Sequence, residues 1–260
     1  LYPTARSIVL GQFTILVLAL VALALWALER GRGLVAGCSL ALATIKPQMV
    51  ILLLPFLLLR ALKERHRTLT SFLATLAILL LLPSLLLPTW IPSFLAGLSR
   101  YQAYTSLYTG GRSPLGILLD FLLPSKPSFW ATLLISLILG GYLIYEWVEA
   151  LKGRGDTSQA LFLTIIVTLL IPVQTGTTNQ VLLLLPLIYW LSRWTKRRWV
   201  ALSLSLILFL GPWTLFLATV RGDAEQPVMF LPLPLFALTY LLAIELRNSI
   251  ALRRRDDATS

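Results

Sequence analysis

The stretch AGCSLALATIKPQMVILLLPFLLLR, residues 36–60, decides how the chain must be organised. It is apolar along almost its whole length, yet Lys46 and Pro47 stand at its middle. A proline removes a backbone hydrogen bond and disfavours helical geometry in the residue before it. A charge inside a membrane is costly and by default points to a function. The pair therefore predicts a break at Lys46-Pro47 in a membrane-embedded helix.

The composition places the whole chain in a membrane. Of its 260 residues, 57% are hydrophobic and 13% are charged, whereas soluble domains carry about 25% charged residues. The apolar runs reach the roughly 20 residues that a helix needs to cross hydrocarbon. They lack the two-residue alternation of a membrane barrel. We therefore predict an all-α fold, a polytopic membrane helix bundle that forms one integral membrane domain over residues 1–260.

Charged or Pro/Gly-rich joints divide the chain into eight apolar runs. We predict about seven full spans and one broken or re-entrant helix pair, the pair being the run 34–59. The runs are 7–28, 34–59, 68–87, 128–148, 157–174, 179–192, 199–220 and 227–246.

The formal net charge of +11 comes from basic clusters that lie between these runs. There they set the orientation of the spans, so we predict no nucleic-acid partner. The positive-inside rule places every cluster on the cytoplasmic side and leaves 88–127, 175–178 and 221–226 outside. The clusters are Arg30 and Arg32; Arg60, Lys63, Arg65 and Arg67; Lys152 and Arg154; Arg193, Lys196, Arg197 and Arg198; and Arg247 with Arg253, Arg254 and Arg255.

The first two clusters flank the run 34–59, and both are expected to be cytoplasmic. A single crossing would put one of them outside, whereas a V-shaped pair, 34–45 and 48–59, keeps both inside. Each arm of about 12 residues would rise only about 18 Å. The ammonium of Lys46 would then face a polar cavity, where a lipid phosphate is its natural partner. The alternative is one kinked span with a snorkelling lysine.

Residues 88–127 form the one sizeable segment between spans, and we expect it to lie at the external interface. Its second half predicts a short helix with Ser113 as the cap and Pro114 at the first position. Its first half carries apolar and aromatic residues at near-helical spacing, namely Phe94, Leu98, Tyr101 and Tyr108.

Arg100 and Arg112 are the cations of this segment best placed for a phosphate, because a guanidinium presents a planar fork of donors. With Tyr104, which lies between them, we include them among the candidate substrate-binding residues. The alternative is a plain interfacial lid without a ligand.

A second polar stretch, PVQTGTTNQ at 172–180, separates two apolar helices. Its side chains, Asn179 and Gln180 among them, offer the neutral donors and acceptors that sugar hydroxyls need. The same residues would also build a tight external turn, and that alternative stays open.

Other familiar sites are missing from the sequence. Cys38 is the single cysteine and His66 the single histidine, so no zinc-type metal site is predicted. No glycine-rich phosphate loop occurs, so the sequence shows no evident binding site for a nucleotide sugar. No cofactor is predicted.

The stretch LGQFTILVLALVALALWALERGRGLVAGCSLALATIKPQMVILLLPFLLLRAL, residues 10–62, resembles the signature of glycosyltransferase family 87. These are bacterial polytopic, mannosyltransferase-like proteins. The resemblance is carried by Gly11-Gln12, Arg30-Gly31-Arg32, Ala36-Gly37 and Lys46-Pro47, and it adds Gln12 to the candidate substrate-binding residues. It is weaker over YQAYTSLYTGGRSPLGILL and PVQTGTTNQVLLLLP, where many relatives carry a Ser-Pro and a histidine-bearing motif.

The resemblance implies a C-type glycosyltransferase fold in the bacterial cell membrane, embedded as a multi-pass protein among membrane lipids. It implies transfer of a hexosyl, and in particular a mannosyl, group from a polyprenyl-phosphate-linked sugar to a lipid or glycan acceptor on the external face.

The resemblance also implies a catalytic aspartate in the first external loop. No residue here matches that aspartate, and the chain opens with Leu1, so we expect a C-terminal fragment of a longer protein with the base upstream. Among the external acids, Asp120, Asp223 and Glu225, none is assigned as catalytic.

The main alternative is a transporter or flippase of lipid-linked sugars. Such carriers usually show intramembrane carboxylates and internal repeats, and neither is visible here. A structural membrane partner without activity is a third possibility.

Overall fold

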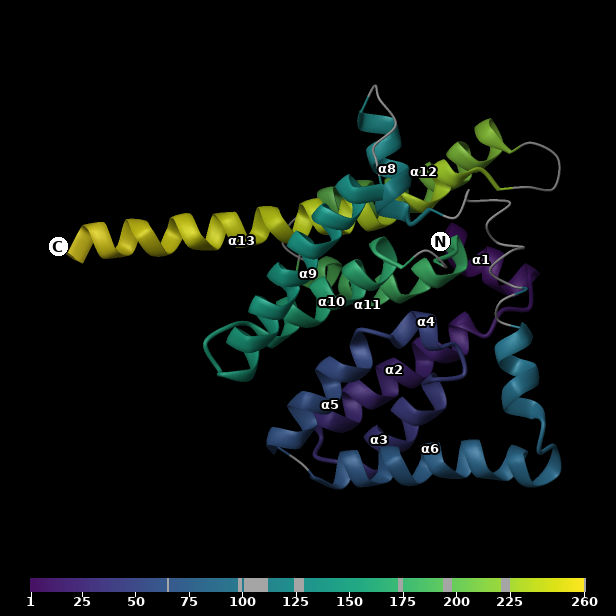
Figure 1. Cartoon of the computed structure of the whole chain (residues 1–260). Coiled ribbons are helices and arrows are strands. Elements are labelled where there is room, and N and C mark those ends of the chain that lie inside the picture. Colours follow the sequence, from purple (N-terminus) through teal and green to yellow (C-terminus); the bar gives the residue numbers. More distant parts are fainter. Residues whose placement is uncertain are drawn as a thin grey trace.

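The computed structural model describes residues 1–64, 66–97, 100, 112–123, 129–172, 175–193, 198–220 and 225–259. This part of the chain is all-α, as predicted, and its helices form a bundle (Figure 1). The elements are α1 (Tyr2–Val9), α2 (Thr14–Glu29), α3 (Gly33–Ala43), α4 (Pro47–Val50), α5 (Leu53–Glu64), α6 (His66–Leu86), α8 (Pro114–Leu122), α9 (Phe129–Leu151), α10 (Thr157–Leu170), the 3₁₀ helix η1 (Thr177–Leu183), α11 (Leu184–Arg193), α12 (Arg198–Thr219), the 3₁₀ helix η3 (Pro227–Phe230) and α13 (Pro232–Thr259). Residues 90–97 are also helical.

Within the described part, four helices are long and apolar enough to cross a membrane. They are His66–Leu86, Phe129–Leu151, Trp199–Thr219 and Pro227–Leu246. They expose side chains that a soluble protein would bury, such as Leu85, which is 80% exposed. Shorter apolar helices, Thr14–Glu29, Gly33–Ala43 and Thr157–Leu170, contribute many of the buried core residues. The protein is therefore a membrane helix bundle.

Two of the predicted runs are divided differently from what the sequence suggested. The run 7–28 contains two helices, because α1 ends before Gly11, which has a positive φ of 59°, and α2 starts at Thr14. The run 179–192 begins as the 3₁₀ helix η1 and continues as α11. Pro186 has no N–H to bond to the carbonyl of Leu182, which favours the change of helix type at this point.

The predicted break at Lys46-Pro47 is confirmed. Helix α3 ends at Ala43, Lys46 has non-helical dihedrals (φ −129°, ψ 76°), and Pro47 opens the one-turn helix α4. A second turn at residues 51–52 leads into α5.

The chain also reverses at this break, so that α3 and α5 form a hairpin. Ser71 Oγ donates to the Gly33 carbonyl at 3.1 Å, and Thr75 Oγ1 lies 3.2 Å from Cys38 Sγ. Helices α3 and α6 therefore run in parallel from the same end of the bundle. Because α5 leads almost directly into α6, it must finish where α3 begins. This geometry is the re-entrant pair and not the single kinked span.

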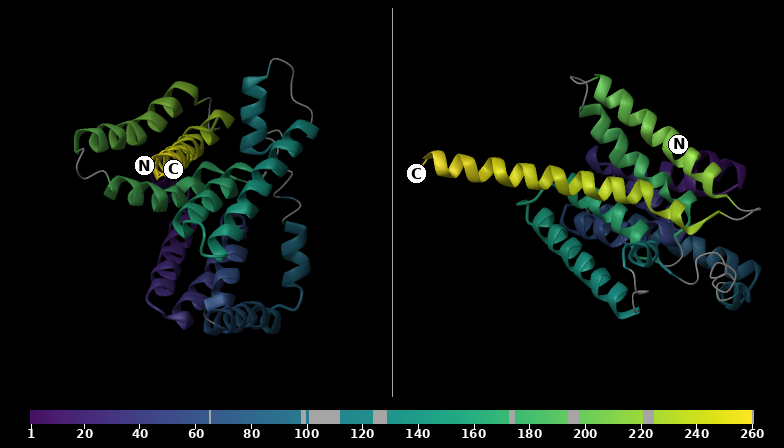
Figure 2. Two further views of the ribbon diagram at one scale, coloured as in Figure 1. Left: turned by 90° about the vertical axis from the view of Figure 1, so that its left-hand side faces the viewer. Right: turned by 90° about the horizontal axis from the view of Figure 1, so that it is seen from above.

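The loops that carry three of the predicted basic clusters, namely those before α3, after α5 and after α9, meet at one end of the bundle, which we call the basic end. Lys63 Nζ donates to the Leu151 carbonyl, so the loops after α5 and α9 meet. A Cβ on Gly33 would lie 3.2 Å from Arg67 Cβ, so the loop before α3 joins them. The C-terminal part of α13 projects beyond this end (Figure 2). The opposite end, which we call the distal end, carries α1, the α3–α4 turn, η1, η3 and α8.

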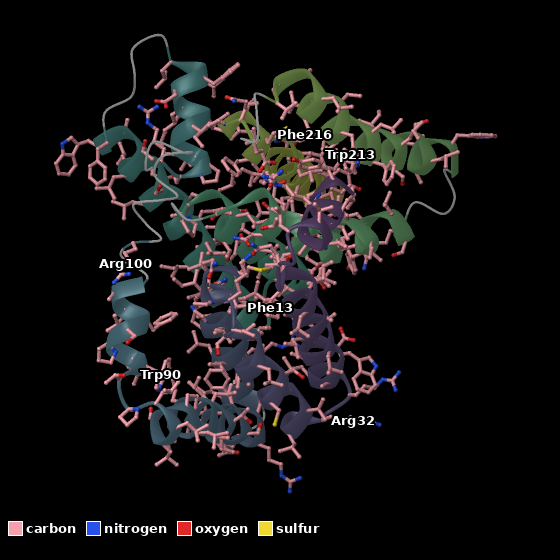
Figure 3. The ribbon with its side chains drawn as sticks, turned by 90° about the vertical axis from the view of Figure 1, so that its right-hand side faces the viewer. Phe13, Arg32, Trp90, Arg100, Trp213 and Phe216 are labelled. Carbon is pink, nitrogen blue, oxygen red and sulfur yellow. The ribbon has the colours of Figure 1, made fainter. Side chains whose placement is uncertain are left out.

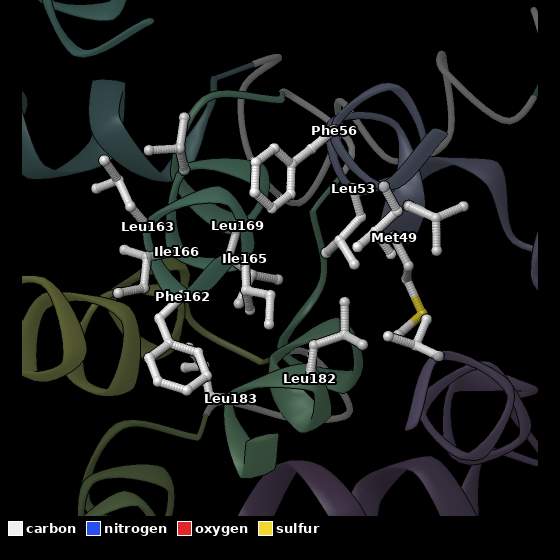
Figure 4. Packing of buried hydrophobic residues seen from close by; sticks show 14 of the residues in the cluster. Met49, Leu53, Phe56, Phe162, Leu163, Ile165, Ile166, Leu169, Leu182 and Leu183 are labelled. Carbon is white, nitrogen blue, oxygen red and sulfur yellow. The ribbon is translucent and has the colours of Figure 1, made fainter. Parts of the chain in front are cut away.

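Helices α4 and α5 pack in the core against α10 and η1. Met49, Leu53 and Phe56 meet Ile165 of α10 and Leu182 of η1 (Figure 4), and each of the five is at most 1% exposed. In a bilayer such contacts stabilise through van der Waals packing, because lipid tails are as apolar as leucine. The hairpin is thus anchored against α10, and its tip lies at the distal end.

Candidate functional site

Lys46 and Gln12 meet at the tip of the hairpin. Lys46 Nζ donates to Gln12 Oε1 at 2.9 Å, although the two residues are 34 positions apart in the chain. Lys46 is partly buried and Gln12 is exposed. The ammonium keeps two further N–H donors and the amide keeps two of its own. The structure therefore brings together two of the predicted substrate-binding residues, with donors left for an anion.

Gln12 reaches Lys46 because α1 ends in a tight turn. Gly11 adopts the left-handed conformation, and the Gln12 N–H donates to the Ser7 carbonyl at 2.8 Å. The next residue, Phe13, is exposed at the junction of α1 and α2 (Figure 3). The position of Gln12 thus depends on how α1 is held.

Helix α1 is held by Glu225, whose side chain is only 8% exposed. Its carboxylate accepts from Tyr2 Oη at 2.9 Å and from Thr177 Oγ1 at 2.8 Å, and it pairs with Arg6 Nε at 3.1 Å. Burial, and then the negative charge of Glu225, raise the pKa of Tyr2, so its hydroxyl keeps the proton that it donates. We call Tyr2, Arg6, Thr177 and Glu225 the Glu225 cluster.

Further contacts of α1 support the same position. The Tyr2 ring lies 5.0 Å from that of Trp213 and 5.2 Å from that of Phe216, both on α12 (Figure 3). Ser7 Oγ lies 3.4 Å from the Thr178 carbonyl of η1. Helix α1 is therefore fixed to η1, to α12 and to the segment before η3. These contacts set the position of Gln12, which follows the end of α1.

The Glu225 cluster could hardly be predicted from the sequence. Tyr2 and Glu225 are 223 positions apart, and no spacing rule links such residues. The one available signal was that Glu225 is among the few acids in the predicted external stretches.

Asn179 and Gln180 are buried in η1, at 2% and 3% exposure. The Gln180 amide donates to the Phe230 carbonyl at 2.9 Å and so links η1 to η3. Asn179 Oδ1 has no hydrogen-bond partner within the described part of the chain. The two residues build a compact turn, and sugar binding by them stays a prediction.

Arg112 lies in a different polar group from Lys46. It forms an ion pair with Asp120. Arg112 directly precedes the Ser113 cap of α8, and Asp120 lies within the helix. Ser113 Oγ accepts from the Gly116 N–H at 3.1 Å and Pro114 opens the helix, which confirms the predicted cap and first position. The pair lines a cavity of about 520 Å³ between α8, the end of α12 and η3.

The remaining predicted residues lie on the segment 88–127. Arg100 is exposed beyond the helical stretch 90–97 (Figure 3). Tyr104 lies outside the described residues, as do Tyr101 and Tyr108 of the predicted first interfacial helix. Among the described residues, no three His, Cys, Asp or Glu side chains come together in a group that could hold a metal ion.

Fold and site together define an integral membrane protein with a hydrogen-bonded lysine at the tip of a broken helix, at the end opposite its basic loops. The family model of glycosyltransferase family 87 matches residues 1–171. The chain therefore belongs to glycosyltransferase family 87 and is a membrane glycosyltransferase, which confirms the resemblance seen in the sequence. The match includes Gln12, Lys46 and Arg112 and ends before η1. Neither a search of curated proteins nor a search of solved structures found a match.

Proposed function

We propose that the protein transfers a hexosyl group, in particular a mannosyl group, from a polyprenyl-phosphate-sugar to a lipid or glycan acceptor at the external face of the bacterial cell membrane. The observation that carries this proposal is the Lys46–Gln12 pair at the tip of the broken helix. A lipid-linked donor needs a cation for its phosphate, and a cation at the tip of a membrane-embedded hairpin is accessible to a ligand that arrives through the bilayer.

The surroundings of the pair suit the lipid part of such a donor. Ile45 and Ile51 on either side of Lys46 are 53% and 55% exposed, and Phe13 beside Gln12 is 60% exposed. These side chains present apolar surface directly next to the polar pair. A polyprenyl chain would pack on that surface while its phosphate meets the ammonium.

The charge distribution supports the proposed sidedness. The basic end collects the loops after α2, α5 and α9, and the positive-inside rule places such loops in the cytoplasm. The distal end, with Lys46, Gln12 and the Glu225 cluster, then faces outward. Transfer at this face would use a lipid-linked donor, because soluble nucleotide sugars are cytoplasmic substrates.

In the proposed step, an acceptor hydroxyl oxygen attacks the anomeric carbon of the donor sugar. The bond from that carbon to the phosphate oxygen breaks, its electron pair stays on the lipid phosphate, and the hydroxyl proton passes to a base. Lys46 would stabilise the charge that develops on the departing phosphate.

No residue of the described part is proposed as the base. Asp120 is paired with Arg112, and the carboxylate of Glu225 already has three donor partners. The role of base therefore stays with the aspartate that the family resemblance implies.

The proposal is tested with the full natural chain in proteoliposomes that contain an acceptor lipid extract. We expect label from polyprenyl-phosphate-[³H]mannose to appear in a new product. Label from GDP-[³H]mannose should remain in the nucleotide sugar. Exchange of intact labelled donor across the bilayer without a new product would instead support a flippase and overturn the proposal.

A further inference from the structure

The cavity beside α8 is separate from the Lys46–Gln12 pair and has its own chemistry. It is bounded by α8, by the end of α12 and by η3, and both helices contact η3. At about 520 Å³, it falls within the range of roughly 300–1,000 Å³ that is usual for ligand sites. Its walls include Arg112, Asp120, Ala218 and Gln226.

The charges in this cavity cancel. The guanidinium of Arg112 is paired with the carboxylate of Asp120, and both side chains are partly exposed, at 45% and 21%. A lone arginine would attract a phosphate, but a neighbouring carboxylate repels one. The pair is better suited to a neutral ligand that both donates and accepts hydrogen bonds. Adjacent sugar hydroxyls do both, since they can donate to the carboxylate and accept from the free guanidinium N–H groups.

The other walls fit the rest of a sugar-bearing amphiphile. Gln226 adds an amide that can bond to a hydroxyl, and Ile117, Pro227 and Val228 offer apolar surface for ring C–H groups. Phe121 is 77% exposed at the rim, where an aromatic ring suits the level of the lipid headgroups. Helices α8 and α4 both contact α10, so the cavity and the hairpin tip share one supporting helix.

We propose that this cavity is a carbohydrate subsite that binds the neutral sugar end of an amphiphile. Its assignment to the acceptor rests on the proposed function, in which Lys46 holds the donor phosphate. The cavity then holds the acceptor through the Arg112–Asp120 pair, which binds hydroxyls and not a phosphate.

The test uses the full chain in nanodiscs and two labelled probes of equal chain length, hexyl α-mannopyranoside and hexyl phosphate. We expect saturable binding of the mannoside, with little competition from hexyl phosphate. In Asp120→Asn the mannoside affinity should fall about tenfold or more, and hexyl phosphate binding should rise because Arg112 loses its anionic partner. Asp156→Asn is the matched control, because Asp156 caps α10 at the basic end and asparagine caps equally well.

A second variant, Ala218→Trp, fills the cavity and leaves the ion pair in place, so it should also abolish mannoside binding. Efficient displacement of the bound mannoside by hexyl phosphate would overturn the inference, because a phosphate bound at Lys46 leaves this cavity free. So would mannoside binding that neither Asp120→Asn nor Ala218→Trp changes. If mannoside binding depends on Asp120 while no transfer from the lipid-linked donor occurs, the subsite stands and the proposed function fails. If transfer occurs while mannoside binding does not depend on Asp120, the proposed function stands and the subsite fails.

Discussion

Replacing Lys46 by alanine is expected to weaken the affinity for a polyprenyl-phosphate-sugar by tenfold or more. The substitution removes a charge-assisted hydrogen bond to the phosphate, worth about 1.5–3 kcal/mol, and each 1.4 kcal/mol corresponds to about a factor of ten. It also leaves Gln12 without the partner that it has at 2.9 Å. Equilibrium binding of labelled donor in nanodiscs measures the effect directly.

Two further variants make the result specific. Lys46→Arg keeps the charge and should retain most of the affinity. Lys63→Ala removes a lysine of the basic end, which donates to the Leu151 carbonyl, and should leave donor affinity unchanged. Equal affinity in the unmodified protein and in Lys46→Ala would remove the phosphate role of this lysine.

Replacing Gly37 by alanine is expected to destabilise the bundle strongly. Helices α3 and α6 touch here so closely that a Cβ on Gly37 would overlap Ser71 Oγ and the Thr68 carbonyl and would lie 2.7 Å from the Phe72 nitrogen. Because two of these atoms belong to the backbone of α6, the helices must move apart. Overpacking typically costs about 1–3 kcal/mol, and small residues at such crossings are what allow helices to pack closely in membranes.

The measurement is the thermal unfolding midpoint of the purified protein in detergent, monitored by fluorescence-detected size-exclusion chromatography. Gly140→Ala in α9 is the matched control, since a Cβ at that position has no neighbour within 4 Å. We expect a clear drop for Gly37→Ala and little change for Gly140→Ala. Equal midpoints for the two variants would mean that the close α3–α6 contact does not hold the hairpin.

Much of the fold could be predicted because its causes are local. The composition predicted the membrane bundle, and Pro47 predicted the break in the run 34–59. The two basic clusters that flank this run predicted the reversal of the chain, which the α3–α6 contacts confirm. Ser113-Pro114 gave the start of α8. Each of these follows from a residue acting within a few positions or from the side of the membrane that a charge prefers.

The rest depends on contacts between distant residues. Nothing near Gln12 shows that Lys46 will meet it, although the family resemblance pointed to both. The pairing of Arg112 with Asp120 changes the expected ligand of Arg112. It depends on the tertiary geometry at the start of α8, because Arg112 precedes the Ser113 cap and Asp120 lies within the helix. The Glu225 cluster joins the first and last parts of the chain, which no periodicity could reveal.

The role of Lys46 is tested most directly by locating the donor phosphate on the protein. A polyprenyl-phosphate-mannose analogue with a photoreactive group next to the phosphate is bound to the full chain in nanodiscs, activated, and mapped by mass spectrometry. If Lys46 and Gln12 hold the phosphate, we expect adducts in residues 10–14 and 44–51, which excess unlabelled donor suppresses. Adducts confined to the Arg112–Asp120 cavity or to the basic end would contradict this role.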